Sequence, residues 1–179
     1  MRIEPLAIEG CFLVHGMKAT DVRGWFWKTF EREEFLRHGL DFECRETFYS
    51  LSVPGVLRGM HFQVPPKAHD KLVTCVAGRA FDVMLDLRKG SPGFGKSLSV
   101  DLNAESGVSV FVPAGVAHGF CTPWSQALMS YHTSAPYDPT CDLGINWDSF
   151  GMRWPLQQPP IVSPRDASLP ALDRFATPF

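Results

Sequence analysis

In the stretch FDVMLDLR, residues 81–88, every second side chain is apolar. The apolar series is Phe81, Val83, Leu85 and Leu87, and between its members stand Asp82, Met84, Asp86 and Arg88. Successive side chains of a β-strand point to opposite faces, so this alternation predicts a strand with one face in the core. On the other face, we expect the two aspartates to make structural hydrogen bonds.

Short apolar runs of the same kind lie on both sides of this strand, from Phe48 to Tyr131. They are rich in Val, Leu and Phe, and the residues that separate them are the Gly, Pro, Asn and Asp typical of turns. Examples are KLVTCVAG (71–78), KSLSVDLN (96–103) and VSVFVPAG (108–115). Many short strands in succession predict an all-β sandwich or barrel.

Two segments depart from this pattern. In RGWFWKTFEREEFLRHGL, residues 23–40, aromatic and charged residues interleave, which predicts a short helix over roughly 29–38. The C-terminal tail, residues 155–179, is too rich in proline for regular structure. We expect this tail to pack on the barrel in extended form and to end in a short helix that begins at Ser168.

Length and composition restrict the classes of protein that the chain can belong to. Its 179 residues suit one domain with a single substantial core, spanning residues 1–179. A content of 45% hydrophobic and 20% charged residues is typical of a soluble protein, and no run approaches the ~20 apolar residues of a membrane span. The N-terminus lacks the pattern of a secretory signal, so we expect a cytoplasmic location. A net charge of −2 argues against nucleic acid as a partner. The five cysteines have no CxxC spacing, which argues against a disulfide framework or a zinc site.

Two strings of sequence carry a first resemblance. GVLRGMH (55–61) followed by KLVTCVAG (71–78) has the glycine and histidine spacing of the first cupin motif, and PAGVAH (113–118) has that of the second. The chain therefore resembles the cupins, and this resemblance implies a double-stranded β-helix, or jelly-roll, barrel with a few short helices.

The metal-ligand positions of the cupin motifs are altered in this chain. They are occupied by His61, Gln63, Lys71 and His118, where a metal cupin has His, His, Glu and His. An ammonium among the ligands repels a divalent cation and replaces the only anionic ligand, so we predict no metal. Two imidazoles and an ammonium suit proton transfer and the stabilisation of an anion instead. A metal-dependent oxygenase or isomerase that uses the three remaining ligands is a competing interpretation, which metal analysis of the protein would test.

Further strings narrow the resemblance from a fold to a family. GVLRGMHFQ, VFVPAGVAHGF, SYHTSAPYDP, GINWD and PPIVSPRDASLP occur in the order found in dTDP-4-dehydrorhamnose 3,5-epimerases and their relatives. The similarity extends from about Gly10 to about Leu172. It implies a metal-independent isomerase without a cofactor, acting on a nucleotide-diphosphate-linked 4-keto-6-deoxyhexose. It also implies a homodimer that exchanges N-terminal strands within residues 1–50.

The family resemblance also implies a role for individual residues. His61 is the implied catalytic base, held by Asp166, and Tyr131 is the implied acid. Lys71 is expected beside the C4 carbonyl oxygen of the sugar, where a cation stabilises an enolate. The implied substrate-binding residues are Arg23, Arg58, Gln63, His118, Tyr137, Asp142 and Arg165, with Arg23 reaching the site of the partner subunit. From the residue type alone, Asp166 has a second interpretation, as the N-cap of a short helix.

Four positions depart from the family pattern. Glu46, Thr47 and Phe48 stand where the family commonly has Gln, Asp and Asn, and Lys28 replaces a usual acidic residue. These positions are expected at the nucleotide end of the substrate. The nucleobase is therefore left open, as is inversion at C3, at C5 or at both. A relative that inverts one carbon of a non-thymidine nucleotide sugar, and a cupin that binds a nucleotide sugar without catalysis, remain as alternatives.

Overall fold

The longest strand of the computed structural model, β7 (Lys71–Asp86), belongs to two different sheets. Up to Gly78 it pairs with β9 (Val108–Val112) and β11 (Ala127–Thr133). From Arg79 onward it pairs with β8 (Ser97–Asn103) and β10 (Val116–Cys121). The structure describes residues 1–179, and all pairings between its strands are antiparallel.

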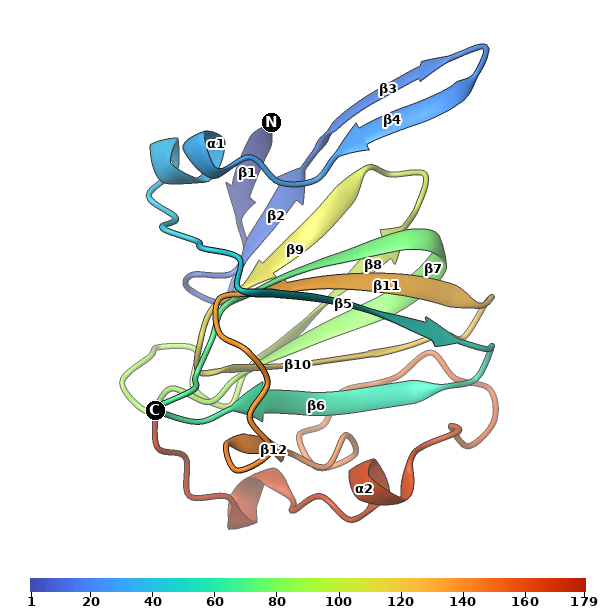
Figure 1. The fold of residues 1–179 in the computed structure, drawn as a ribbon. Coiled ribbons are helices and arrows are strands. Elements are labelled where there is room, and N and C mark those ends of the chain that lie inside the picture. The colour runs from blue at the N-terminus through green and yellow to red at the C-terminus, as the bar shows by residue number, and fades with distance from the viewer.

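The other strands extend these two sheets (Figure 1). The first sheet has the order β1 (Arg2–Pro5), β2 (Phe12–His15), β9, first half of β7, β11, β5 (Glu46–Ser52). The second sheet has the order β8, second half of β7, β10, β6 (Leu57–Gln63), β12 (Asp142–Gly144). Two antiparallel sheets that face each other and share a strand form a jelly roll, so the predicted all-β architecture is confirmed.

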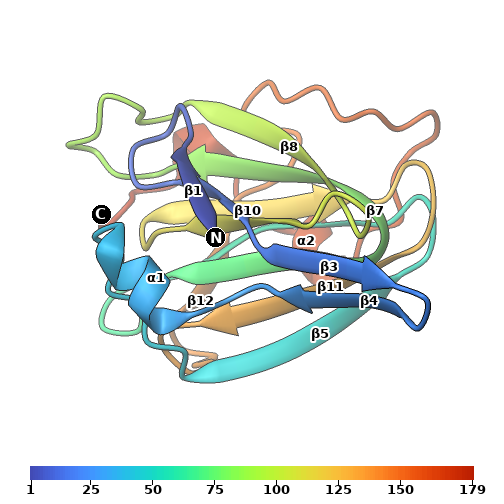
Figure 2. The same cartoon turned by 90° about the horizontal axis from the view of Figure 1, so that it is seen from above.

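A separate hairpin extends from this body. It consists of β3 (Met17–Asp21) and β4 (Gly24–Lys28), which pair only with each other. Figure 1 shows the hairpin at the same end of the molecule as helix α1 (Arg32–Arg37), and Figure 2, seen from above, shows α1 at the left and the hairpin extending to the right. The sequence placed a helix over roughly 29–38, so α1 is confirmed as an element, although it is shorter.

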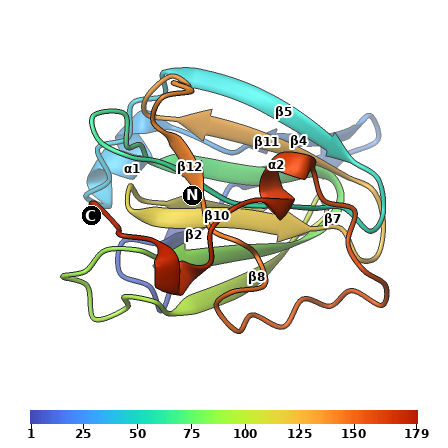
Figure 3. The ribbon, with the colours of Figure 1, turned by 90° about the horizontal axis from the view of Figure 1, so that it is seen from below.

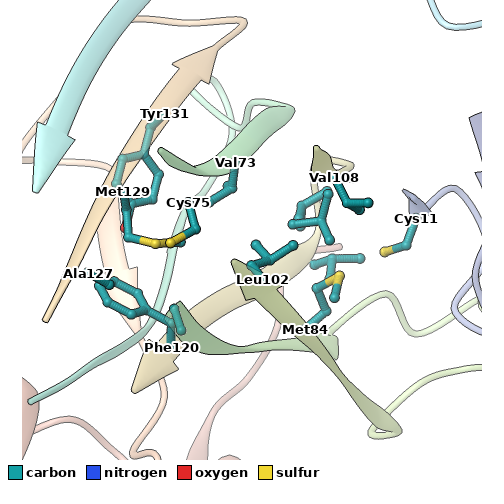
Figure 4. Packing of buried hydrophobic residues seen from close by; sticks show 14 of the residues in the cluster. Cys11, Val73, Cys75, Met84, Leu102, Val108, Phe120, Ala127, Met129 and Tyr131 are labelled. Carbon is teal, nitrogen blue, oxygen red and sulfur yellow. The ribbon is translucent and has the colours of Figure 1, made fainter. Parts of the chain in front are cut away.

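The side chains between the sheets form the main core, a cluster of 15 buried residues. Val73, Cys75 and Met129 enter it from the first sheet, while Met84 and Phe120 enter it from the second (Figure 4). Burial of apolar surface of this kind is the main favourable contribution to folding. The core occupies one end of the space between the sheets and leaves the other end for polar groups.

The apolar face predicted for residues 81–88 is buried in an unexpected place. Val83, Leu85 and Leu87 pack on the outside of the second sheet, where the C-terminal segment covers them with residues such as Trp154 and Phe175. Figure 3 shows this segment, coloured red, lying across that sheet. Because the tail covers the outer face, the opposite face of β7 is free to point between the sheets. Asp82 is therefore fully buried inside the molecule.

The C-terminal segment contains two short helical turns, α2 (Pro164–Ala167) and η1 (Leu172–Arg174). The expectation of a helix that begins at Ser168 is wrong, since Ser168 is the residue that ends α2. Proline suits the first position of a helix, and the Oγ of Ser163 caps the N-terminus of α2. Because of these two residues, α2 begins at Pro164, four positions before the expected start.

Two further features concern the cysteines and the helices. All five cysteines are free, and only Cys44 is exposed. None of the helices has the length and apolar content that a membrane crossing requires.

Gly78, where β7 passes from one sheet to the other, has no room for a side chain. Its φ is +77°, and a Cβ there would lie 1.8 Å from the carbonyl oxygen of Gln126. We predict that Gly78→Ala lowers the free energy of unfolding by about 2–4 kcal/mol, through backbone strain and the clash. Urea denaturation measures this change. Gly90→Ala, where a Cβ would meet no atom, is the matched control and should change stability little; equal effects at both positions would contradict the argument.

Candidate active site

Two side chains of β6 face the space between the sheets although three positions separate them. The pairing of β6 with β10 matches His61 with His118 and Arg58 with Phe120, so β6 has one residue more than β10 in this interval. Such a bulge reverses the alternation of side chains, and it brings Arg58 and His61 to the same cavity. Gly59 permits the close approach, because a Cβ there would lie 2.6 Å from the β10 backbone.

The cavity between the sheets has a volume of about 210 Å³. Its lining residues are Phe48, Ser50, Arg58, His61, Lys71, His118, Gly119, Phe120 and Tyr131. A neighbouring hollow of about 200 Å³ shares Phe48, His61 and Lys71 with it. A third, of about 310 Å³, lies between β6 and α2 and shares Arg58 and His61. His61 thus lines all three hollows.

His61 forms a hydrogen-bonded pair with Asp166 of α2. The imidazole Nε2 lies 2.7 Å from Oδ1 of the carboxylate, and the backbone N–H of Gly59 donates to Oδ2 at 3.1 Å. Burial by itself would raise the pKa of Asp166, but the hydrogen bond from His61 and its charge lower the pKa below the usual value. Asp166 is therefore a carboxylate that fixes the imidazole and leaves Nδ1 free. The N-cap interpretation of Asp166 is wrong, because Ser163 is the cap of α2.

Lys71 points towards His61. Its Nζ donates a hydrogen bond of 3.1 Å to the backbone oxygen of His61. Burial lowers the pKa of Lys71 to about 8, against the opposing effect of Asp142 and Asp82. At neutral pH the side chain is still mostly an ammonium, and it is the positive charge next to the imidazole.

Tyr131 approaches the cavity from the first sheet, opposite β6. Its ring stacks on Phe48, with ring centroids 4.7 Å apart and an interplanar angle of 11°. The phenol oxygen lies 3.4 Å from Oγ of Ser50. Burial raises the pKa of Tyr131 well above its usual range, so the phenol keeps its proton at neutral pH.

A second imidazole and carboxylate pair lies deeper. His118 Nε2 is 2.8 Å from Oδ2 of Asp82, and both side chains are buried. Burial raises the pKa of Asp82, while His118 acts in the opposite direction. The sequence pattern predicts only a structural role for Asp82, because the alternation places it opposite the apolar face. Its proximity to His118 comes from the pairing of β7 with β10, which sequence spacing does not reveal.

The donor set does not suit a divalent cation. No group of three or more His, Cys, Asp or Glu side chains is arranged to hold a metal ion. His61 and His118 each direct a ring nitrogen to a carboxylate, and the Lys71 ammonium occupies the position of the missing anionic ligand. A cation here would have to displace these hydrogen bonds and overcome the repulsion of Lys71.

The remaining predicted binding residues lie around this centre. Arg165 forms an ion pair with Asp142 at 2.7 Å, beside the hollow that both residues line. Tyr137 is exposed at the rim of the same hollow. Arg58 donates to Ser52 Oγ at 3.0 Å.

Gln63 lines the same hollow as Arg165 and Asp142, whereas Arg23 lies apart from it. The Gln63 amide is used within the chain, since Nε2 donates to the carbonyl oxygen of Lys67 and Oε1 accepts from Asp138 N–H at 2.6 Å. Arg23 lies at the turn of the β3–β4 hairpin, with a side chain that is 86% exposed and paired with Asp21. A hollow of about 500 Å³ follows that hairpin, but no imidazole lines it.

The four departures from the family pattern also have defined surroundings. Lys28 pairs with Glu31 at 2.9 Å, away from the cavity. Glu46 accepts the backbone N–H of Tyr137 at 2.7 Å and lines the hollow next to the cavity. Thr47 bonds to His132 at 2.9 Å, and Phe48 covers Tyr131.

Comparison with known proteins agrees with this fold and site. The family model described as dTDP-4-dehydrorhamnose 3,5-epimerase matches residues 5–174. A dTDP-4-dehydrorhamnose 3,5-epimerase of Sinorhizobium fredii is 38% identical over 182 residues, covering 100% of this chain and 93% of its own length. A dTDP-4-dehydrorhamnose 3-epimerase of Streptomyces niveus is 36% identical over 169 residues, covering 93% of this chain and 81% of its own length. The crystal structure of a dTDP-6-deoxy-D-glucose-3,5-epimerase of Legionella pneumophila superposes with a TM-score of 0.93 at 30% identity, covering 98% of this chain and 94% of that one.

The class of protein follows from these findings: the chain is an isomerase with a cupin-like jelly-roll fold, as its sequence predicted. Within that class, it belongs to the dTDP-4-dehydrorhamnose 3,5-epimerase family. The resemblance found in the sequence motifs is therefore confirmed over nearly the whole chain.

The burial of Lys71 generates a prediction that does not depend on substrate. We expect its amine to titrate with a pKa of about 8, losing its charge as the pH rises through that value. NMR of the Cε groups in ¹³C-lysine-labelled protein measures the titration, and Lys71→Arg identifies the signal by removing it. A midpoint near the ordinary ~10.4 would show that the amine is hydrated rather than buried.

Proposed function

We propose that this chain inverts C3, C5 or both in a 4-keto-6-deoxyhexose linked to a nucleoside diphosphate. The observation that carries the proposal is the placement of the His61–Asp166 pair and Tyr131 on opposite walls of one cavity, which the Lys71 ammonium also lines. The Legionella relative, whose structure contains dTDP-4-keto-L-rhamnose, supports this substrate class. The names of the relatives favour thymidine as the base.

The first step is removal of a proton from carbon. The C4 carbonyl acidifies the hydrogens on C3 and C5, and the free Nδ1 of His61 takes one of them. The C–H electron pair moves into the ring to form the C=C bond of the enolate, and the C4 oxygen becomes negative. Asp166 stabilises the imidazolium that results, as a carboxylate does when it holds the second ring nitrogen of a base.

Lys71 supplies the charge that the enolate needs. An ammonium next to the C4 oxygen stabilises the negative charge that develops there, and loss of one such donor typically costs ~10²–10³ in rate. The same group must be protonated to do this. Activity should therefore fall as the pH rises through about 8, the pKa to which burial lowers that of Lys71.

Tyr131 completes the inversion from the opposite wall. Its phenol gives a proton to the face of the enolate carbon that His61 does not contact. The resulting tyrosinate then regains a proton from solvent, and the His61 imidazolium releases its proton to solvent. The raised pKa of Tyr131 keeps the phenol protonated until the enolate, a stronger base, is present. Arg58 and His118 line the cavity and Arg165 lines the hollow next to it, which supports a role for these residues in binding the sugar and its diphosphate.

We further propose that two copies of the chain complete each other's sites. Arg23 is distant from His61 in the fold of one chain, at the end of a hairpin whose residues Trp25 and Phe26 are exposed. Exchange of these N-terminal strands in a homodimer would bring the guanidinium to the partner subunit's substrate, and it would cover the aromatic side chains. Sedimentation equilibrium of the protein would measure the oligomeric state.

The base assignment is tested by His61→Asn, which keeps a polar side chain but cannot take the proton. We predict that kcat falls about 10²–10⁴-fold. Uptake of deuterium from D₂O at C3 and C5, followed by NMR with a dTDP-4-keto-6-deoxyhexose, should fall equally. His38→Asn, at the exposed residue that directly follows α1, is the control and should keep the parent rate. Exchange at the parent rate in His61→Asn would exclude His61 as the base, and tight binding without any exchange in the parent would favour a non-catalytic binding protein.

The acid assignment is tested by Tyr131→Phe, which keeps the ring and removes its hydroxyl. We predict that deuterium still enters from solvent with retention of configuration, because His61 can return the proton, whereas inversion falls about 10²–10⁴-fold. The control is Tyr49→Phe, which removes the hydroxyl of an exposed tyrosine. Tyr49 follows Phe48 in β5 and therefore points to the opposite face of that strand. Unchanged inversion in Tyr131→Phe would exclude this role.

A further inference from the structure

Phe48 lies directly opposite Tyr131 in the pairing of β5 with β11. Residues opposite each other in antiparallel strands have adjacent side chains, and here the two rings are nearly parallel, 11° apart in plane at a centroid distance of 4.7 Å. Phe48 also lines both the cavity and the hollow next to it. It thus separates the face of the Tyr131 ring from the solvent side of the site.

The other contacts of the Tyr131 ring constrain it less. Its hydroxyl has one protein partner, Ser50 Oγ, at 3.4 Å, which is long for a hydrogen bond between hydroxyl groups. The His118 ring meets it edge-on with centroids 6.0 Å apart. A phenol held by one long hydrogen bond depends on packing for its direction, and the largest flat surface against it is Phe48.

We propose that Phe48 is a positioning residue for the proton donor, holding the Tyr131 ring in the plane from which its hydroxyl reaches the enolate carbon and keeping water from that hydroxyl. The inference rests on the proposed role of Tyr131. Phe48 acts through Tyr131 and takes no proton itself. A small misplacement of a catalytic group can cost ~10²-fold in rate, so loss of the stack should be measurable in the inversion step.

The position of Phe48 makes this role separable from a role in folding. The residue is 43% exposed and does not belong to any of the three buried clusters. Its replacement by Leu keeps an apolar side chain on an exposed strand and removes only the flat ring. Thermal unfolding should therefore change little, whereas the orientation of Tyr131 should change.

The experiment compares four variants in D₂O by NMR: Phe48→Leu, Phe48→Tyr, Tyr131→Phe and the double variant Phe48→Leu with Tyr131→Phe. Deuterium entry and inversion are measured separately on the same dTDP-4-keto-6-deoxyhexose. We expect Phe48→Leu to lower inversion about 10- to 100-fold and deuterium entry by less than about threefold, because His61 is unaffected. Phe48→Tyr, which restores a ring, should regain most of the inversion rate. Phe94→Leu, at an exposed loop, is the matched control.

The double variant shows whether the effect passes through Tyr131. If Phe48 acts by positioning the phenol, the substitution costs little once the hydroxyl is absent, and the double variant matches Tyr131→Phe. An additive loss would overturn the inference and make Phe48 a substrate contact or a structural residue. Parent-like inversion in Phe48→Leu would overturn it too. If Tyr131→Phe itself inverts normally, the proposed acid is wrong; if only Phe48→Leu is normal, the acid stands and this inference fails.

Discussion

The hydrogen bond between His61 and Asp166 connects parts of the chain that are 105 residues apart. It fixes the imidazole, and it also attaches α2 and the C-terminal segment to β6. The carboxylate is held in turn by the backbone of Gly59, inside the bulge that brings Arg58 to the same side. The orientation of the His61 imidazole and the attachment of α2 to β6 thus depend on one buried carboxylate.

Electrostatic balance decides what kind of chemistry this cavity supports. The positive groups Arg58 and Lys71 stand beside two carboxylates, Asp82 and Asp166, each of which is paired with an imidazole. Both carboxylates are therefore already hydrogen-bonded to an imidazole. The positive charges of Arg58 and Lys71 are available to a negatively charged ligand or intermediate. In a metal cupin the same framework presents free anionic and neutral donors to a cation. Replacement of one glutamate by Lys71 inverts the charge that the site attracts.

Sequence patterns predicted the strands and the set of site residues, but not how several of them meet. Alternation identified the strand at 81–88 and could not show that the tail covers its apolar face, which turns Asp82 inwards to His118. Residues three apart, such as Arg58 and His61, fall on opposite faces of a regular strand, and only the bulge unites them. The predicted role of Gln63 came from its motif position alone. In the structure its side-chain amide forms hydrogen bonds with the backbone of Lys67 and Asp138. Motifs give the residue type at each position. The contacts between these residues depend on how segments that are distant in the sequence pair with one another.

Because β7 contributes to both sheets, Lys71 on one wall and Asp82 on the other lie on one continuous strand. The two sheets consequently cannot slide past each other or separate without breaking that strand at Gly78. Adjustment to sugars of different size falls to the hairpin, the loops and the C-terminal segment. New substrate specificities in such a molecule should therefore arise through changes in the hairpin, the loops and the C-terminal segment, while the two sheets stay the same.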